Sequence, residues 1–165
     1  MSIAQPLIEE LTQEAAATRI LLERVPEAHW EWTPHPKSMS IAYLASHMAE
    51  SLGWTAGALA QDELEMDMDA YQPFVADNKA AMLSAFDDNL AAALEVLKGQ
   101  SDERMLALWR MTAKGTALLE MPRVAVVRVF VLNHLIHHRG QLTVYLRLKD
   151  VPLPSIYGPT ADEPM

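Results

Sequence analysis

Two histidines one helical turn apart lie in an otherwise apolar stretch near the end of the 165-residue chain. In the sequence N-H-L-I-H-H-R-G-Q-L-T-V-Y-L of residues 133–146, His134 and His138 share one helical face at about 100° per residue. Val131 precedes them on that face and Leu142 follows, so both imidazoles are expected to face a core. Buried imidazoles need polar partners, and a shared metal ion would supply them.

A third histidine, His47, lies beside the apolar stripe of an earlier helical segment. One hypothesis is a divalent metal bound by His47, His134 and His138, because three imidazoles with an open fourth position are typical of catalytic zinc sites. The alternative is that His134 and His138 are core histidines hydrogen-bonded to the backbone or to Gln141, and that His47 is unrelated to them. Spacing alone leaves both interpretations open.

The remaining histidines fit the site less well. His137 is about 100° away from His138 around the helix and is predicted to be exposed. His29 and His35 lie in a proline-containing connection, where a solvated role is expected.

Several other side chains could surround a bound ion. Gln141 and Glu50 each follow a candidate ligand by three residues, so either could orient it, although solvation at the surface is the expected role of Glu50. Four aromatic residues are candidates for the walls of a pocket: Trp30, Trp54, Tyr145 and Tyr157.

Composition excludes several classes of protein. The formal charge of −9 and the scattered basic residues argue against a nucleic-acid partner. Because cysteine is absent, disulfides, a thiolate nucleophile and a cysteine-ligated zinc site are all excluded. The first ten residues lack a basic start and an apolar core, and the longest apolar runs are too short to span a membrane. A cytoplasmic protein with no membrane partner is therefore expected.

Apolar periodicity near 3.6 predicts four long helices, at residues 2–24, 40–61, 79–98 and 122–149. The long connections between the first three favour a crossover topology. Residues 101–121 are ambiguous between short helical turns and a hairpin-like link at Lys114-Gly115. The sequence thus predicts one all-α domain over residues 1–165, a four-helix bundle with the proline-containing tail 151–165 extended and packed on it.

Three blocks of the sequence resemble the DinB family, also called the DinB/YfiT-like metalloenzymes. They are Lys37-Ser38-Met39-Ser40 before the helix of His47, the histidine block of residues 133–147, and V-P-L-P-S-I-Y-G-P-T-A-D-E at residues 151–163. The resemblance implies an up-down-down-up four-helix bundle, a homodimer, and one divalent metal whose ligands fall on His47, His134 and His138.

The reaction is less defined than the site. Some relatives in the resembled family are thiol transferases that use low-molecular-weight thiols, which implies a metal-dependent thiol (S-) transferase acting on a small-molecule substrate. A non-catalytic stress-response helical dimer with a structural metal, and a metal-dependent hydrolase, are the alternatives. Zinc or nickel is the favoured ion, with iron and manganese open.

Overall fold

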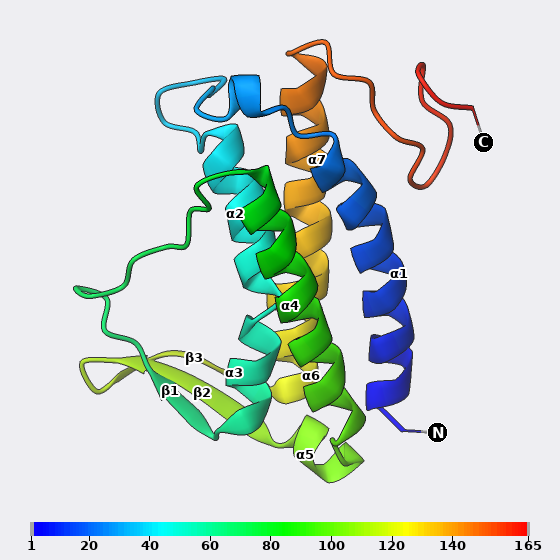
Figure 1. Cartoon of the computed structure of the whole chain (residues 1–165). Coiled ribbons are helices and arrows are strands. Elements are labelled where there is room, and N and C mark those ends of the chain that lie inside the picture. The colour runs from blue at the N-terminus through cyan, green and yellow to red at the C-terminus, as the bar shows by residue number, and fades with distance from the viewer. Residues whose placement is uncertain (1, 165) are drawn as a thin grey trace.

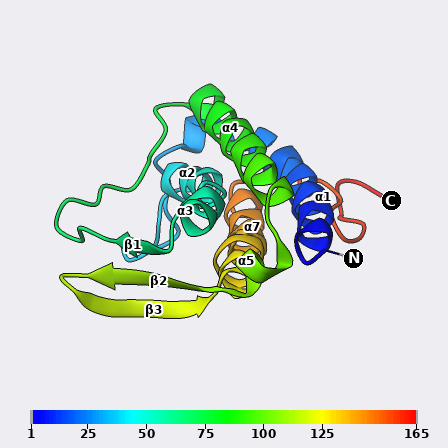
Figure 2. The ribbon, with the colours of Figure 1, turned by 90° about the horizontal axis from the view of Figure 1, so that it is seen from below.

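The computed structural model describes residues 2–164. Its core is formed by four long helices: α1 (Ala4–Glu23), α2 (Ile41–Ser51), α4 (Lys79–Lys98) and α7 (His134–Arg147). Helix α1 packs against α4 and α7, and α2 packs against the same two helices, so the four surround a common apolar interior (Figure 2). This arrangement holds α2 and α7, which carry the candidate ligands, against each other.

Local sequence signals place the helix starts. Ser40 caps α2 by accepting a hydrogen bond from the backbone N–H of Tyr43, and Asn78 caps α4 by accepting from that of Ala81. The predicted third helix at 79–98 is confirmed with the same bounds.

The predicted helix at 40–61 is divided in two. Helix α2 ends at Ser51, and a separate helix, α3 (Trp54–Ala60), follows after a turn at Gly53. A Cβ at Gly53 would lie 3.0 Å from Oδ1 of Asn89, whose amide donates to the carbonyl of Ala49. Glycine at this turn therefore permits the close approach of α4.

The all-α four-helix bundle predicted from the sequence is wrong, because the chain also forms a three-stranded mixed sheet. The strands are β1 (Glu63–Glu65), β2 (Leu108–Ala113) and β3 (Thr116–Pro122), in the order β1-β2-β3. Strand β1 pairs parallel with β2, and β2 pairs antiparallel with β3. The sheet lies at the end of the molecule where α3, α5 (Asp102–Leu106) and α6 (Arg123–Val126) are found (Figure 1).

The hairpin depends on two residues with positive φ. Lys114 and Gly115 have φ of 51° and 72°, as a two-residue turn that matches the twist of the flanking strands requires. Both alternatives for residues 101–121 are thus observed, since the short helix α5 directly precedes the hairpin of β2 and β3. The strand β1 falls in the connection between the predicted helices at 40–61 and 79–98.

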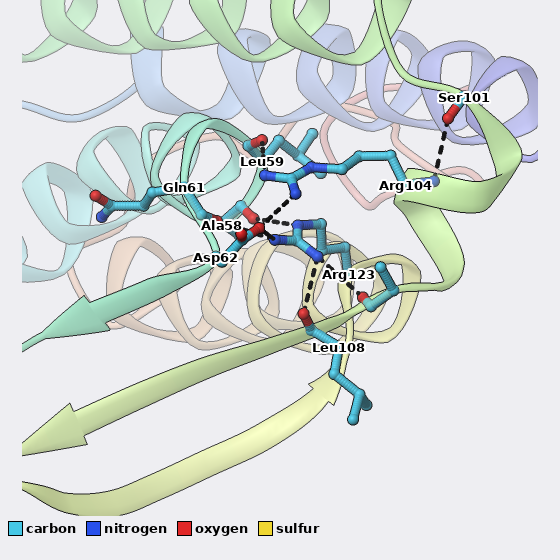
Figure 3. A network of polar contacts seen from close by, with 9 residues as sticks. Ala58, Leu59, Gln61, Asp62, Ser101, Arg104, Leu108 and Arg123 are labelled. Carbon is cyan, nitrogen blue, oxygen red and sulfur yellow. Dashed lines mark hydrogen bonds and ion pairs between the residues drawn. The ribbon is translucent and has the colours of Figure 1, made fainter.

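One buried arginine joins the sheet to the helices (Figure 3). The side chain of Arg123 is fully buried and donates to the carbonyl oxygens of Ala58 and Gln61 near the end of α3, and of Leu108 in β2. Its guanidinium also pairs at 2.6 Å with the carboxylate of Asp62. Because buried carbonyls need donors, Arg123 holds together three segments that are far apart in the sequence.

The last predicted helix, at 122–149, is built from three pieces. Helix α6 passes into a π-helical segment, η2 (Val127–Asn133), and then into α7. After α7, residues 148–164 form no helix or strand and run beside α1 and α7 (Figure 1). A short 3-10 turn, η1 (Glu27–His29), lies between α1 and α2. None of the described helices is both long and apolar enough to cross a bilayer.

A second polar cluster, built on the buried side chains of Arg139 and Glu14, fixes the tail. The guanidinium of Arg139 lies 2.7 Å from the carboxylate of Glu14, and it also donates to the hydroxyl of Tyr157. The Tyr157 hydroxyl in turn donates to Glu14. Burial raises the pKa of Tyr157, as does its hydrogen bond to Glu14, so it stays protonated and able to donate. The cluster ties the tail to α1 and α7. Its arginine, Arg139, directly follows His138 in the sequence.

Candidate metal centre

The structure brings the three predicted histidines together. His47 lies on α2, and His134 and His138 lie one turn apart at the start of α7. Nε2 of His134 is 3.3 Å from Nε2 of His47 and 3.0 Å from Nε2 of His138. One nitrogen from each ring thus faces a common point, with all three ligand atoms within 4.8 Å of one another. Their role as metal ligands remains a prediction.

The outer nitrogen of His138 has a defined partner. Its Nδ1 lies 2.7 Å from the side-chain carbonyl oxygen of Gln141, which can only accept, so Nδ1 carries the proton. In the neutral ring, Nε2 of His138 therefore presents a lone pair toward the other two histidines. Gln141 performs the orienting role that partners of metal-bound histidines have in other proteins.

The three neutral rings cannot satisfy one another. Nε2 of His134 lies between the other two Nε2 atoms and has at most one proton to donate, so at least one lone pair remains without a donor. Among the described residues, the buried Nδ1 of His134 also has no hydrogen-bond partner. Three convergent imidazole nitrogens are a donor set that divalent transition metals prefer, so the residues fit such an ion.

Burial keeps these rings neutral. Desolvation, with a smaller contribution from the neighbouring histidines, lowers the pKa of His134 to about 4. Desolvation is also the largest cause that lowers the pKa of His47 and of His138. Because metal binding requires the unprotonated ring, the site is ready to accept an ion at neutral pH.

The π-helical segment η2 ends directly before His134. Segments of this kind are rare, and they occur often at functional sites because they change the register of the residues that follow. Nothing in the residue pattern of 127–133 distinguishes this segment from an ordinary α-helix. It is therefore a feature of the site that sequence analysis missed.

Aromatic and acidic side chains surround His47. The ring of Tyr43 stacks on it at 6.4 Å between centroids, and the ring of Trp54 contacts it edge-on at 5.6 Å. A carboxylate oxygen of Glu50 lies 4.0 Å from its Nδ1, and the hydroxyl of Tyr71 donates to that carboxylate at 3.4 Å. Glu50 thus lies beside His47, as its orienting alternative requires, although the sequence favoured solvation at the surface.

Of the other residues that the sequence suggested for the site, some lie beside it and others lie elsewhere. His137 is exposed, as predicted, and His29 and His35 lie in the connection before α2. Of the four aromatic residues proposed for pocket walls, only Trp54 lines the cavity beside the site. Trp30 and Tyr145 pack on the main core instead, and the ring of Tyr157 is largely exposed.

A cavity of about 550 Å³ opens beside His47. Its walls come from α2 and α3, from β1 to β3 and the loop after β1, and from α6 and η2. Tyr43 could have been found from the sequence, since it precedes His47 by one helical turn. Tyr71 and the strand residues could not, because only the hairpin and the loop after β1 bring them to this place.

Comparisons with known proteins agree with this fold. The chain is 27% identical over 157 residues to the uncharacterized protein YrdA of Bacillus subtilis (strain 168), covering 91% of this chain and 85% of YrdA. Its fold is similar to that of a DinB-like protein from Bacillus cereus ATCC 10987, with a TM-score of 0.70, 17% identity, and coverage of 92% of this chain and 95% of that one.

A second solved structure, the DinB-like protein YjoA of Bacillus subtilis, has a TM-score of 0.69 at 18% identity and covers 91% of this chain and 96% of its own. At these identities the structural likeness supports the fold alone. The family model described as the DinB family matches residues 1–164. This match spans nearly the whole sequence, and the chain therefore belongs to the DinB family.

Proposed function

We propose that this protein is a divalent-metal-dependent enzyme that transfers a low-molecular-weight thiol to an electrophilic substrate. The observation that carries the proposal is the convergence of the Nε2 atoms of His47, His134 and His138 at the edge of a cavity large enough for a small molecule. The chain contains no cysteine, so a reacting sulfur has to come from a bound thiol.

The three histidines would hold the ion, for which zinc and nickel are the favoured candidates. When bound, such an ion lowers the pKa of a coordinated thiol or water and so makes a nucleophile available at neutral pH. Gln141 keeps the ring of His138 in the required tautomer and orientation. Trp54 covers His47 and His134 with its indole ring and limits the access of water to them.

The proposed transfer balances as a substitution. The thiol sulfur forms a bond to an electrophilic carbon, and the bond from that carbon to the leaving group breaks with its electron pair going to the leaving group. The thiol proton passes to solvent water. The Glu50 carboxylate lies on the Nδ1 side of His47, away from the converging Nε2 atoms, and would orient that ring. Tyr71 holds that carboxylate through its hydroxyl hydrogen bond.

A thiol-transfer assay tests the proposal. The protein is incubated with glutathione, cysteine or coenzyme A and with chlorodinitrobenzene as electrophile, and conjugates are measured by mass spectrometry. We expect transfer that is lost on chelation, restored by added zinc or nickel, absent in His134→Ala and retained in His137→Ala, whose imidazole is exposed. Metal-dependent melting without any transfer would instead favour a structural metal in a non-catalytic protein.

A further inference from the structure

The side chains that line the cavity beside His47 indicate which class of ligand it binds. We infer that it binds the electrophilic acceptor of the proposed transfer, and that this acceptor is an uncharged, largely apolar small molecule. The identification of this ligand as the acceptor of the transfer rests on the proposed function. The binding site and the chemical class of its ligand rest on the cavity itself.

Within residues 2–164, the lining contains no formally charged side chain. Its body is made by apolar groups from the sheet and from the helices, among them Leu64, Met111, Leu119, Val126 and Phe130. The only titratable groups in the wall are His47, Tyr43 and Tyr71. Burial raises the pKa of Tyr71, so its hydroxyl is neutral near pH 7.

Away from the ion that the three histidines would hold, a charged ligand would have no compensating partner in the wall of this cavity. An anion would meet no lysine or arginine in the wall, and it would approach the carboxylate of Glu50 behind His47. A cation would lose its hydration to an apolar surface without a carboxylate in the lining. Because burial of an unpaired charge is costly, both are disfavoured relative to a neutral molecule.

The cavity has the size and access that a small molecule needs. Its volume of about 550 Å³ lies within the usual range for small-molecule sites. Met68, Tyr71 and Leu118 belong to its wall and are 56%, 41% and 51% exposed, so the cavity reaches the surface along this rim. A ligand entering there would lie with one end against His47.

Gly57 offers a way to fill the cavity without disturbing its walls. It lies on α3 in the lining, and a Cβ added there meets no atom within 4 Å. Gly140 on α7 is a matched control, because it is also a helical glycine with open space at its Cβ but is exposed and outside the lining. Leucine at either position has a higher helix propensity than glycine, so both variants are expected to fold.

The probe is N-phenyl-naphthylamine, an uncharged fluorophore, compared with anilinonaphthalene sulfonate, which has the same rings and an added negative charge. We expect saturable binding of the uncharged probe at one site per chain. Gly57→Leu should weaken it by about tenfold or more, and Gly140→Leu by less than about twofold. After chelation, when no ion at the histidines can attract it, the sulfonate should bind at least about tenfold more weakly than the uncharged probe.

Thermal melting and metal content, measured on both variants, show whether each is folded and loaded like the wild type. Equal effects of Gly57→Leu and Gly140→Leu on probe binding in folded protein, or equal affinity for the two probes, would overturn the inference. Neither readout requires turnover. A protein that binds the probe as expected but shows no thiol transfer therefore refutes the proposed function and leaves the apolar binding site intact.

Discussion

At the scale of single residues, the site depends on which nitrogen of each ring is free. His138 is the clearest case, because the carbonyl oxygen of Gln141 fixes the proton on Nδ1 and leaves Nε2 facing His134 and His47. His134 lacks such a partner at Nδ1 among the described residues, and desolvation together with the neighbouring histidines lowers its pKa to about 4. The two residues are therefore expected to respond differently to substitution around them.

Gln141 provides the first test of this geometry. Gln141→Leu removes the acceptor for Nδ1–H of His138, and we expect metal affinity to fall by about tenfold to hundredfold, as is usual when the partner of a metal-bound histidine is lost. Gln141→Glu keeps an acceptor at the same place and should retain most of the affinity. Competition titration with a chelating dye measures both, and equal affinities for Leu and Glu would contradict the assigned role.

Stability of the metal-free protein should depend on pH through the same rings. Because the pKa of His134 is lowered to about 4, the unfolded state binds more protons below its ordinary value of 6.5, and folding is disfavoured there. Above pH 6.5 the titration of His134 does not lower the free energy of unfolding. As the pH falls from 6.5 toward 4, the free energy of unfolding decreases. Urea unfolding between about pH 7.5 and 4.5 should show this decline. His134→Ala should flatten it, whereas His137→Ala should leave it unchanged; identical slopes in all three proteins would argue against buried neutral rings.

At the scale of elements, the sequence predicted the helices better than the sheet. Helix α4 was predicted with its correct bounds because its apolar period is regular, and the structure shows that Asn78 caps it. The strands were missed because β1 is only three residues long, and because its pairing with β2 joins residues 63–65 to 110–112, a contact that no local pattern reports. Only the turn at Lys114-Gly115 carried a local signal for the hairpin.

Arg123 should be the main link between the sheet and the helices. Arg123→Met leaves several carbonyl oxygens without donors, and we expect a loss of about 2–4 kcal/mol in the free energy of unfolding. Arg104 also pairs with Asp62, but it is one-third exposed, so Arg104→Met is the control and should cost less. Denaturant unfolding measures both variants. A smaller loss for Arg123→Met than for Arg104→Met would show that the buried network does not hold the sheet.

At the scale of the whole molecule, the sheet adds a cavity beside the three histidines. Four helices alone bring His47, His134 and His138 together, and this convergence was predicted because each histidine lies on or beside an apolar stripe. The cavity beside them needs the sheet, the loop after β1 and the turn at Gly53, so it could not be predicted from helical periodicity. A single domain over the whole chain stays a prediction.

The homodimer implied by the family resemblance also stays a prediction. Size-exclusion chromatography with light scattering should give a mass of twice the chain's 18.4 kDa. The same measurement on metal-free protein shows whether assembly depends on the ion. A mass of one chain at all concentrations would contradict the dimer without bearing on the three histidines.

The most direct test of the central claim is the metal content of untagged protein by elemental analysis after growth with added zinc, nickel, iron and manganese. We predict about one ion per chain in the wild type and in His137→Ala, and far less in His47→Ala, His134→Ala and His138→Ala, because each of these removes one of three ligands. Circular dichroism confirms that each variant is folded. Equal metal content in the wild type and in the three ligand variants would contradict a metal centre at these histidines.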